Sequence, residues 1–224
     1  ICQLIVQFSA QYSMGDTNEN KPSDDRYAAI GVDYQAGALE VGFLVDYLNK
    51  NSSLIDIDEG VADSFDKDAW TINLAANYDF GCLKAFAAAQ YFKNVRDFTG
   101  VFDLETDIQA DVFDLDADSV KMDKEDNAKY MSLKGYGVNL GVDVPALGGN
   151  IMASIGYADG DVRYEKVKAG TLKGYTALAG YSYSFSKRTS AYVGAGWTKY
   201  KVSDDGDATK HQVTQVMTGL VHKF

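Results

Sequence analysis

Apolar and polar residues alternate along ten segments of the chain. Trp70–Phe80 shows the pattern most clearly: every second residue is apolar, and Thr, Asn, Ala or Asp stands between. Only a β-strand places every second side chain on the same face, so each segment predicts a strand with one apolar face. The predicted strands are 4–12, 27–35, 39–48, 70–80, 83–91, 130–144, 150–158, 175–185, 190–201 and 213–224.

The connections between these strands alternate in length. Long polar loops are predicted at 13–26, 49–69, 93–129, 159–172 and 202–212, and tight turns near 36–38, 81, 145–149 and 186–190. Long loops on one rim and short turns on the other are typical of an outer-membrane barrel. The pattern therefore predicts an all-β fold, a transmembrane antiparallel β-barrel with ten strands in this chain.

Composition and charge agree with strands and exclude some partners. The chain has fifteen Tyr, twenty-one Gly and only two Pro, which favours strands with close backbone approaches. The longest apolar run, Ala85–Ala89, is far shorter than the ~20 residues of a membrane helix, whereas a membrane strand needs only ~10 alternating residues. The formal charge of −11 argues against a nucleic-acid partner.

Aromatic residues stand at the ends of the apolar faces, with small or aliphatic residues between them. Tyr and Trp favour the membrane–water boundary, because one edge of the ring is apolar and the other forms hydrogen bonds. A soluble sandwich would also have apolar faces, but its outer face would be rich in Lys and Glu rather than Gly, Ala, Ser and Asn. The predicted membrane girdle comprises Tyr12, Tyr34, Tyr47, Trp70, Tyr78, Tyr91, Tyr175 and Tyr183.

The opposite faces of the strands are predicted to line a pore. The predicted pore-lining residues are Asp33, Glu40, Asp46, Asn73, Asn77, Asp79, Lys84, Gln90, Asn139 and Asp143. Charged rings on a pore wall select ions by sign. Because five acidic residues stand against Lys84 and Lys223 on this face, we expect a modest preference for cations.

The last fifty residues carry a family resemblance. The tyrosine-rich strand Tyr175–Phe185, the turn Ser186–Thr189 and the chain end Gly219–Phe224 resemble the C-terminus of Gram-negative general porins. The resemblance implies a bacterial outer-membrane location, passive diffusion through a homotrimer, contact with membrane lipid and lipopolysaccharide, and delivery to the barrel-assembly machinery through Phe224. It also implies a sixteen-stranded barrel of which these ten strands are the last. Residues 1–224 are expected to be one barrel domain that is truncated at its N-terminus.

Catalytic and metal chemistry find little support in the sequence. His211, in a predicted loop, and His222, on the predicted lipid-facing side, have no Ser or Asp partner at a recognisable spacing, so a phospholipase-like enzyme is disfavoured. Asp114, Asp116 and Asp118 could hold Ca²⁺ or Mg²⁺, but the EF-hand order is absent and solvated acidic loops are the simpler interpretation. No cofactor is expected.

Two functions remain open at this point. The first is a porin that passes ions and small hydrophilic solutes. The second is a non-conducting structural or adhesion barrel with functional acidic loops. Small residues at lumen positions such as Gly31, Gly42 and Ala75 favour an open channel over a lumen filled by side chains.

Overall fold

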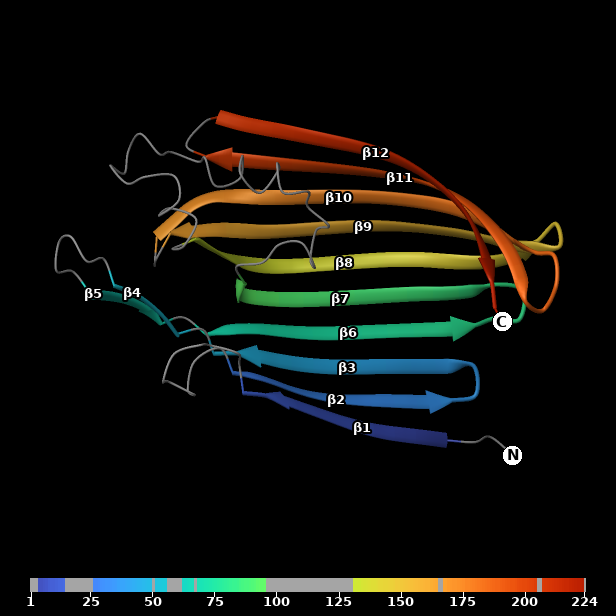
Figure 1. Ribbon diagram of the computed structural model, residues 1–224, viewed down its shortest axis with the longest axis horizontal. Coiled ribbons are helices and arrows are strands. Elements are labelled where there is room, and N and C mark those ends of the chain that lie inside the picture. Colours follow the sequence, from blue (N-terminus) through green and yellow to red (C-terminus); the bar gives the residue numbers. More distant parts are fainter. Residues whose placement is uncertain are drawn as a thin grey trace.

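The computed structural model describes residues 4–14, 26–49, 51–55, 62–66, 68–95, 131–164, 167–204 and 207–223. Ten strands form one antiparallel sheet in which neighbours along the chain lie side by side (Figure 1). They are β1 (Leu4–Ser13), β2 (Tyr27–Ala36), β3 (Leu39–Leu48), β6 (Ala69–Asp79), β7 (Lys84–Val95), β8 (Met131–Ala146), β9 (Gly149–Tyr164), β10 (Val167–Ser184), β11 (Thr189–Asp204) and β12 (Asp207–His222). The sheet is open, with β1 and β12 as its two edges.

The prediction of ten antiparallel strands is confirmed, with one addition. The predicted loop 49–69 contains a short hairpin, β4 (Asn51–Ile55) paired with β5 (Ala62–Asp66), which forms a separate two-stranded sheet. Each of these strands has only five residues, too few for alternation to stand out within an acidic segment. None of the described residues forms a helix of the length and apolarity that crossing a membrane requires.

The predicted long loops 159–172 and 202–212 are wrong. β9 and β10 continue until only residues 165–166 separate them, and β11 and β12 continue until only residues 205–206 do. The outward face of these strand ends is mostly polar, so the apolar alternation that identified the strands fades there. A strand does not need an apolar face outside lipid, because its backbone bonds are made by its neighbours, and polar side chains such as Lys173 and Asp159 pair across strands at 3.4 Å.

The short turns lie together at one end of the sheet, the short-turn end (Figure 1). We call the opposite end of the sheet the loop end. The two-residue turn between β8 and β9 has positive φ at both positions, 53° at Leu147 and 76° at Gly148. Such a turn matches the twist of a hairpin, but it favours Asn or Gly at its first position. Leu147 is 86% exposed, so packing of its side chain does little to offset the cost of its positive φ.

Leu147→Asn should therefore stabilise the protein. Asn adopts positive φ at lower cost than Leu, and we expect a gain of roughly 0.5–1 kcal/mol in the free energy of unfolding. Urea unfolding of the protein in lipid bicelles, followed by tryptophan fluorescence, measures this gain. Leu147→Ala removes the same exposed side chain without easing the backbone, so an equal gain from that control would contradict the explanation.

The two faces of the sheet differ in what they expose. One face presents large apolar side chains to the outside, such as Phe8, which is 78% exposed, and Val216, which is 75% exposed. The other face is hollowed, and residues from β6 to β12 line a cavity of about 590 Å³ on it. At the loop end of the hollow face lies a cluster of fully or almost fully buried side chains, hereafter the buried cluster: Phe92, Leu133, Val162, Leu172, Tyr200 and Val202.

Candidate channel wall

The hollow face gathers the polar residues of the sheet. Strand register places all ten predicted pore-lining residues on it: Asp33, Glu40, Asp46, Asn73, Asn77, Asp79, Lys84, Gln90, Asn139 and Asp143. We call this face the candidate wall. Period-2 alternation along each strand places these side chains on one face of the sheet. The register between neighbouring strands determines which of them contact each other. That they line a channel stays a prediction.

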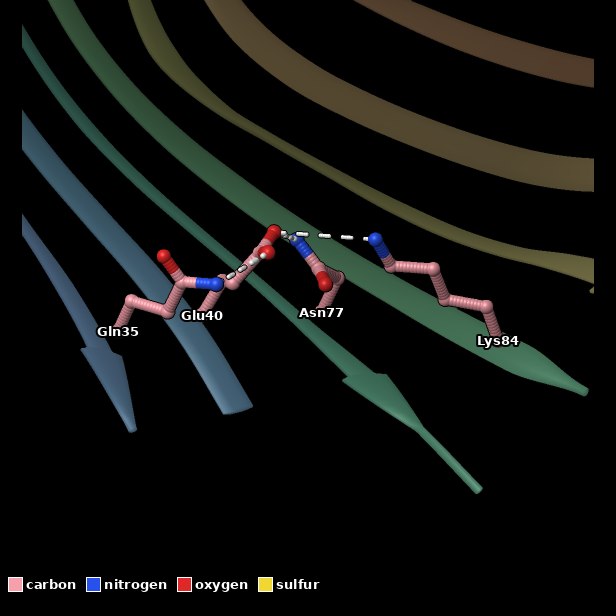
Figure 2. Close-up of polar contacts among 4 residues, drawn as sticks. All are labelled: Gln35, Glu40, Asn77 and Lys84. Carbon is pink, nitrogen blue, oxygen red and sulfur yellow. Dashed lines mark hydrogen bonds and ion pairs between the residues drawn. The ribbon is translucent and has the colours of Figure 1, made fainter. Parts of the chain in front are cut away.

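A first network is centred on Glu40 near the short turns (Figure 2). The Glu40 carboxylate accepts hydrogen bonds from Asn77 Nδ2 at 2.7 Å and from Gln35 Nε2 at 3.3 Å, and it lies 3.7 Å from Lys84 Nζ. The four side chains come from β2, β3, β6 and β7, and register brings them together, since Glu40 stands opposite both Gln35 and Asn77. An ion pair this exposed adds little stability, but the donors hold the charge in place on the wall.

A second network lies nearer the loop end and is centred on Asp46. Its carboxylate accepts hydrogen bonds from Thr71 Oγ1 and from Asn73 Nδ2. The same Asn73 amide donates to Thr71 at 3.1 Å and accepts from Gln90 Nε2 at 2.7 Å. The chain of amides and hydroxyls therefore crosses three strands and fixes the acidic group at one point.

Further acidic groups extend the wall at the short-turn end. Asp143 accepts a hydrogen bond from Asn150 Nδ2 at 2.8 Å and stands opposite Lys84 in the β7–β8 ladder. Asp33 lines a second hollow of about 460 Å³ together with Glu40 and Asn77. Asp79 lies at a third hollow and accepts a hydrogen bond from the backbone N–H of Gly81 at 2.7 Å.

The middle of the wall is uncharged. The 590 Å³ hollow is lined by amides, hydroxyls, glycines and apolar groups, without a charged side chain among the described residues. Three of its polar residues, Thr176, Thr198 and Gln215, were missed by the sequence analysis, as were Gln35, Thr71 and Asn150 in the networks. All six share the alternation of the predicted residues, so the signal was present, but only register shows that they are neighbours.

The loop end of the wall departs from the expected small-residue lining. The buried cluster places large side chains there, including Tyr200 at 1% exposure and Phe92 at 0%. This part of the hollow face is packed rather than open.

The predicted girdle residues lie on the opposite face, in two bands. Tyr12, Tyr47, Trp70, Tyr91 and Tyr175 lie toward the loop end, and Tyr34, Tyr78 and Tyr183 toward the short turns. Rings in each band touch: Tyr47 and Trp70 have centroids 5.1 Å apart, and Tyr183 and Phe185 5.2 Å apart. Their role in a membrane girdle stays a prediction.

Two tyrosines that the sequence analysis left out fill the gap in the loop-end band. Tyr136 stands opposite Tyr91 in register, and its ring centroid lies 6.3 Å from that of Tyr157. Tyr157 in turn lies 5.3 Å from Tyr175. Four neighbouring strands thus carry a continuous row of tyrosines.

The structure describes both histidines that the sequence analysis considered for catalysis. His211 lies in β12, not in a loop as predicted, because β12 begins at Asp207. His222 Nδ1 lies 2.9 Å from Thr189 Oγ1. The described part of the chain holds no group of three potential metal ligands. Asp114, Asp116, Asp118 and the predicted assembly signal Phe224 lie outside the described residues.

Known proteins resemble this chain in sequence. The sequence profile of the Gram-negative porins matches residues 6–203. Major outer membrane protein P.IB of Neisseria sicca is 43% identical over 77 residues, which cover 34% of this chain and 20% of that protein. Major outer membrane protein P.IA of Neisseria meningitidis serogroup C is 31% identical over 107 residues, 47% of this chain and 27% of that protein. The matched segments thus span between 20% and 27% of these relatives.

Solved structures resemble it in fold. A loop-deletion variant of OmpT, an outer membrane protein of Vibrio cholerae, aligns with a TM-score of 0.53 over 96% of this chain and 62% of its own, at 10% identity. A porin structure refined at 1.8 Å resolution aligns with a TM-score of 0.50 over 97% of this chain and 61% of its own, at 18% identity. At these identities the likeness concerns the fold alone. Sequence profile, sheet topology and the two-faced strands lead to one conclusion: the chain belongs to the Gram-negative porin family and is a protein of the bacterial outer membrane.

Proposed function

We propose that this sheet forms part of the wall of a water-filled channel through which ions and small hydrophilic solutes diffuse passively. The observation that carries the proposal is the division of the sheet into a hydrogen-bonded polar face with hollows and an opposite face of exposed apolar side chains. In lipid, such a sheet turns its apolar face outward and encloses the polar face. Family membership favours a channel over an enzyme.

The edges of the sheet set a requirement for the channel. Unpaired backbone N–H and C=O groups are too costly in hydrocarbon, so the edges of β1 and β12 need strand partners in the membrane. We propose that further strands close the barrel, and that the closed barrel assembles as a homotrimer in contact with outer-membrane lipid. Delivery by the barrel-assembly machinery through the last strand belongs to the same proposal.

The wall charge supports a preference for cations. Five of the ten predicted lining residues are acidic and only Lys84 is basic, so their formal charge sums to −4. Glu40 is partly compensated by Lys84, whereas Asp46 and Asp143 are held by neutral donors. Fixed negative charge on a wall raises the local concentration of cations and lowers that of anions.

A specific observation keeps a second function in view. The buried cluster packs large side chains at the loop end of the hollow face, which narrows any passage there. A barrel filled at that level would be a non-conducting structural or adhesion protein. Stepwise single-channel conductance of the closed, assembled barrel in a planar bilayer separates the two, because stable insertion of that barrel without conductance would rule out the channel.

Neutralising three wall aspartates should abolish the cation preference. In the variant Asp33→Asn, Asp46→Asn, Asp143→Asn the formal wall charge rises from −4 to −1, and we expect the cation-to-anion permeability ratio to fall to about 1. The reversal potential under a KCl gradient measures this ratio.

A variant that changes the wall charge in the opposite direction serves as a control. Lys84→Gln makes the wall more negative and should shift the reversal potential further toward cation selectivity. Asp161→Asn removes an acidic group from the outward face of β9 and should leave it unchanged. An anion-selective wild type, or equal shifts for Asp46→Asn and Asp161→Asn, would refute the charge assignment.

A further inference from the structure

An aromatic ring lies on the polar face of the sheet. Phe86 in β7 stands opposite Asn77 in register, which places it on the hollow face, and it is 40% exposed. In the proposed channel this ring faces water, whereas the aromatic residues of the opposite face meet lipid. A single exposed apolar side chain is common and implies no ligand by itself. The groups that surround the ring give it a meaning.

A lysine of the protein itself shows what this part of the wall attracts. The Lys84 Nζ atom lies 5.6 Å from the centre of the Phe86 ring and 3.7 Å from the Glu40 carboxylate. Register sets Lys84 directly opposite two other carboxylates, Asp79 and Asp143, but its side chain extends along the wall toward Glu40 (Figure 2). An ammonium group within about 6 Å of a ring centre is attracted by the aromatic face. The ring and the Glu40 carboxylate therefore act together on one ammonium group.

The same ring and carboxylate line the second hollow of the wall. This hollow, of about 460 Å³, has the size of an ordinary small-molecule site, and Asp33 adds a further carboxylate to it. The Asp33 carboxylate lies over Gly42, since Oδ1 is only 2.9 Å from the position of a Cβ atom there. Small residues lie side by side on the wall at this height: Gly42, Ala75 and Ala88. An aromatic face, two carboxylates and a surface of small side chains suit a compact cation with an apolar body.

We propose that the second hollow binds small organic ammonium cations. The Phe86 ring contacts the methyl or methylene groups around the nitrogen, and the Glu40 and Asp33 carboxylates balance the charge. A strongly hydrated inorganic cation gains less from an aromatic ring than a quaternary ammonium group does, so the site adds selectivity among cations. The role of the site in permeation rests on the proposed channel, whereas the binding itself does not.

Lys84 has a defined part in this proposal, as a tethered competitor for the site. It lines the adjoining third hollow, which shares Glu40 and Asn77 with the second. From there its ammonium group takes up the ring and the carboxylate that a bound cation would use. An exposed ion pair such as Lys84–Glu40 contributes little stability, so an incoming cation displaces it at little cost. Weak binding of this kind allows a solute both to enter a channel site and to leave it.

A matched pair of probes tests the proposal. Choline and its neutral carbon isostere, in which a tert-butyl group replaces the trimethylammonium group, have nearly the same shape and differ in charge. The assembled barrel in detergent is titrated with each probe at constant ionic strength, and NMR saturation transfer to the methyl groups reports binding. Choline should bind several-fold more tightly than the isostere. Equal binding of the two probes would overturn the proposal.

Two substitutions of the ring should act in opposite directions. Phe86→Leu keeps an apolar side chain but removes the aromatic face, and it should weaken choline binding about twofold to fivefold. Phe86→Trp should strengthen choline binding, because Trp attracts cations best among the aromatic residues. The second variant guards against a loss of folding, since a misfolded barrel would not gain affinity. Unchanged binding in both variants, or weaker binding in both, would contradict the role of the ring.

A double-mutant cycle tests Lys84 as the competitor. Lys84→Met should tighten choline binding, and Phe86→Leu should then weaken it by a larger factor than it does with Lys84 present, because the ring is no longer shared. A mere loss of positive charge would tighten binding by the same factor with and without the ring. That additive result would refute the competition. Lys199→Met removes a cation from the opposite face of the sheet, beside Tyr175, and should leave choline binding unchanged.

Conductance separates this site from the channel. Choline should reduce the K⁺ conductance of the wild-type barrel, and it should do so less in the Phe86→Leu variant. A barrel that binds choline through Phe86 but never conducts would refute the channel and leave the site standing. A barrel that conducts but binds choline no better than the neutral isostere would refute the site and leave the channel standing.

Discussion

Leu140→Lys should prevent stable insertion of the protein into a bilayer. Leu140 is 56% exposed on the outward face of β8, four residues from Tyr136 in the loop-end aromatic band. Four residues of strand span about 13 Å, which places Leu140 near the middle of an apolar band about 25 Å tall. A lysine at that depth costs about 2–4 kcal/mol. This is a large share of the stability of an ordinary folded protein.

The neighbouring residue provides the matched control. Asn139 lies on the hollow face of the same strand, so Asn139→Lys adds the same charge at the same height but directs it toward the candidate wall. That variant should insert normally, with a change in stability of about 0.5 kcal/mol or less. Folding into liposomes, followed by urea unfolding, compares the two variants. If Asn139→Lys were the more damaging of the pair, the assignment of the two faces would be reversed.

Gly135→Val should separate β8 from β9. A Cβ atom at Gly135 would overlap the backbone oxygen of Asp159 and lie 2.5 Å from the Cα of Gly160. Gly135 and Gly160 stand opposite each other in register, so the two backbones approach closely where neither residue has a side chain. Backbone atoms cannot rotate away as a flexible side chain can. We expect a loss of about 1–3 kcal/mol, the usual cost of overpacking.

Gly137→Val serves as the control for this second prediction. Gly137 lies two residues along the same strand, but its added Cβ would meet nothing closer than 3.7 Å. Valine has the better strand propensity, so this variant should be neutral or slightly stabilised. Urea unfolding in bicelles measures both. Equal losses of unfolding free energy at the two positions would contradict the explanation, because they would show that replacing any glycine on this strand destabilises the protein, whether or not the backbones approach closely.

The sequence determined the strands and their two faces. Period-2 alternation identified all ten strands of the sheet, because lipid on one side and water on the other impose opposite demands on successive residues. The same alternation assigned Asp33, Asn73 and Asn139 to one face and Trp70, Tyr78 and Tyr175 to the other. In the extensions of β9 to β12 the outward face is mostly polar and the buried residues Val162, Leu172 and Val202 are on the hollow face. The apolar alternation that marks the membrane-facing strands therefore fades, and these extensions were taken for loops.

Tertiary structure decided which residues meet. Glu40 and Lys84 are 44 positions apart in the chain, and only the register of β3, β6 and β7 brings them to 3.7 Å. Lys173, Lys201 and Lys210 likewise stand side by side only because two ladders align them. Register depends on turn geometry and on the sum of many weak cross-strand contacts, and a shift of one residue would reverse every face. Alternation in one strand carries no information about its neighbour, so the hydrogen-bonded networks of the wall arise only when the sheet assembles.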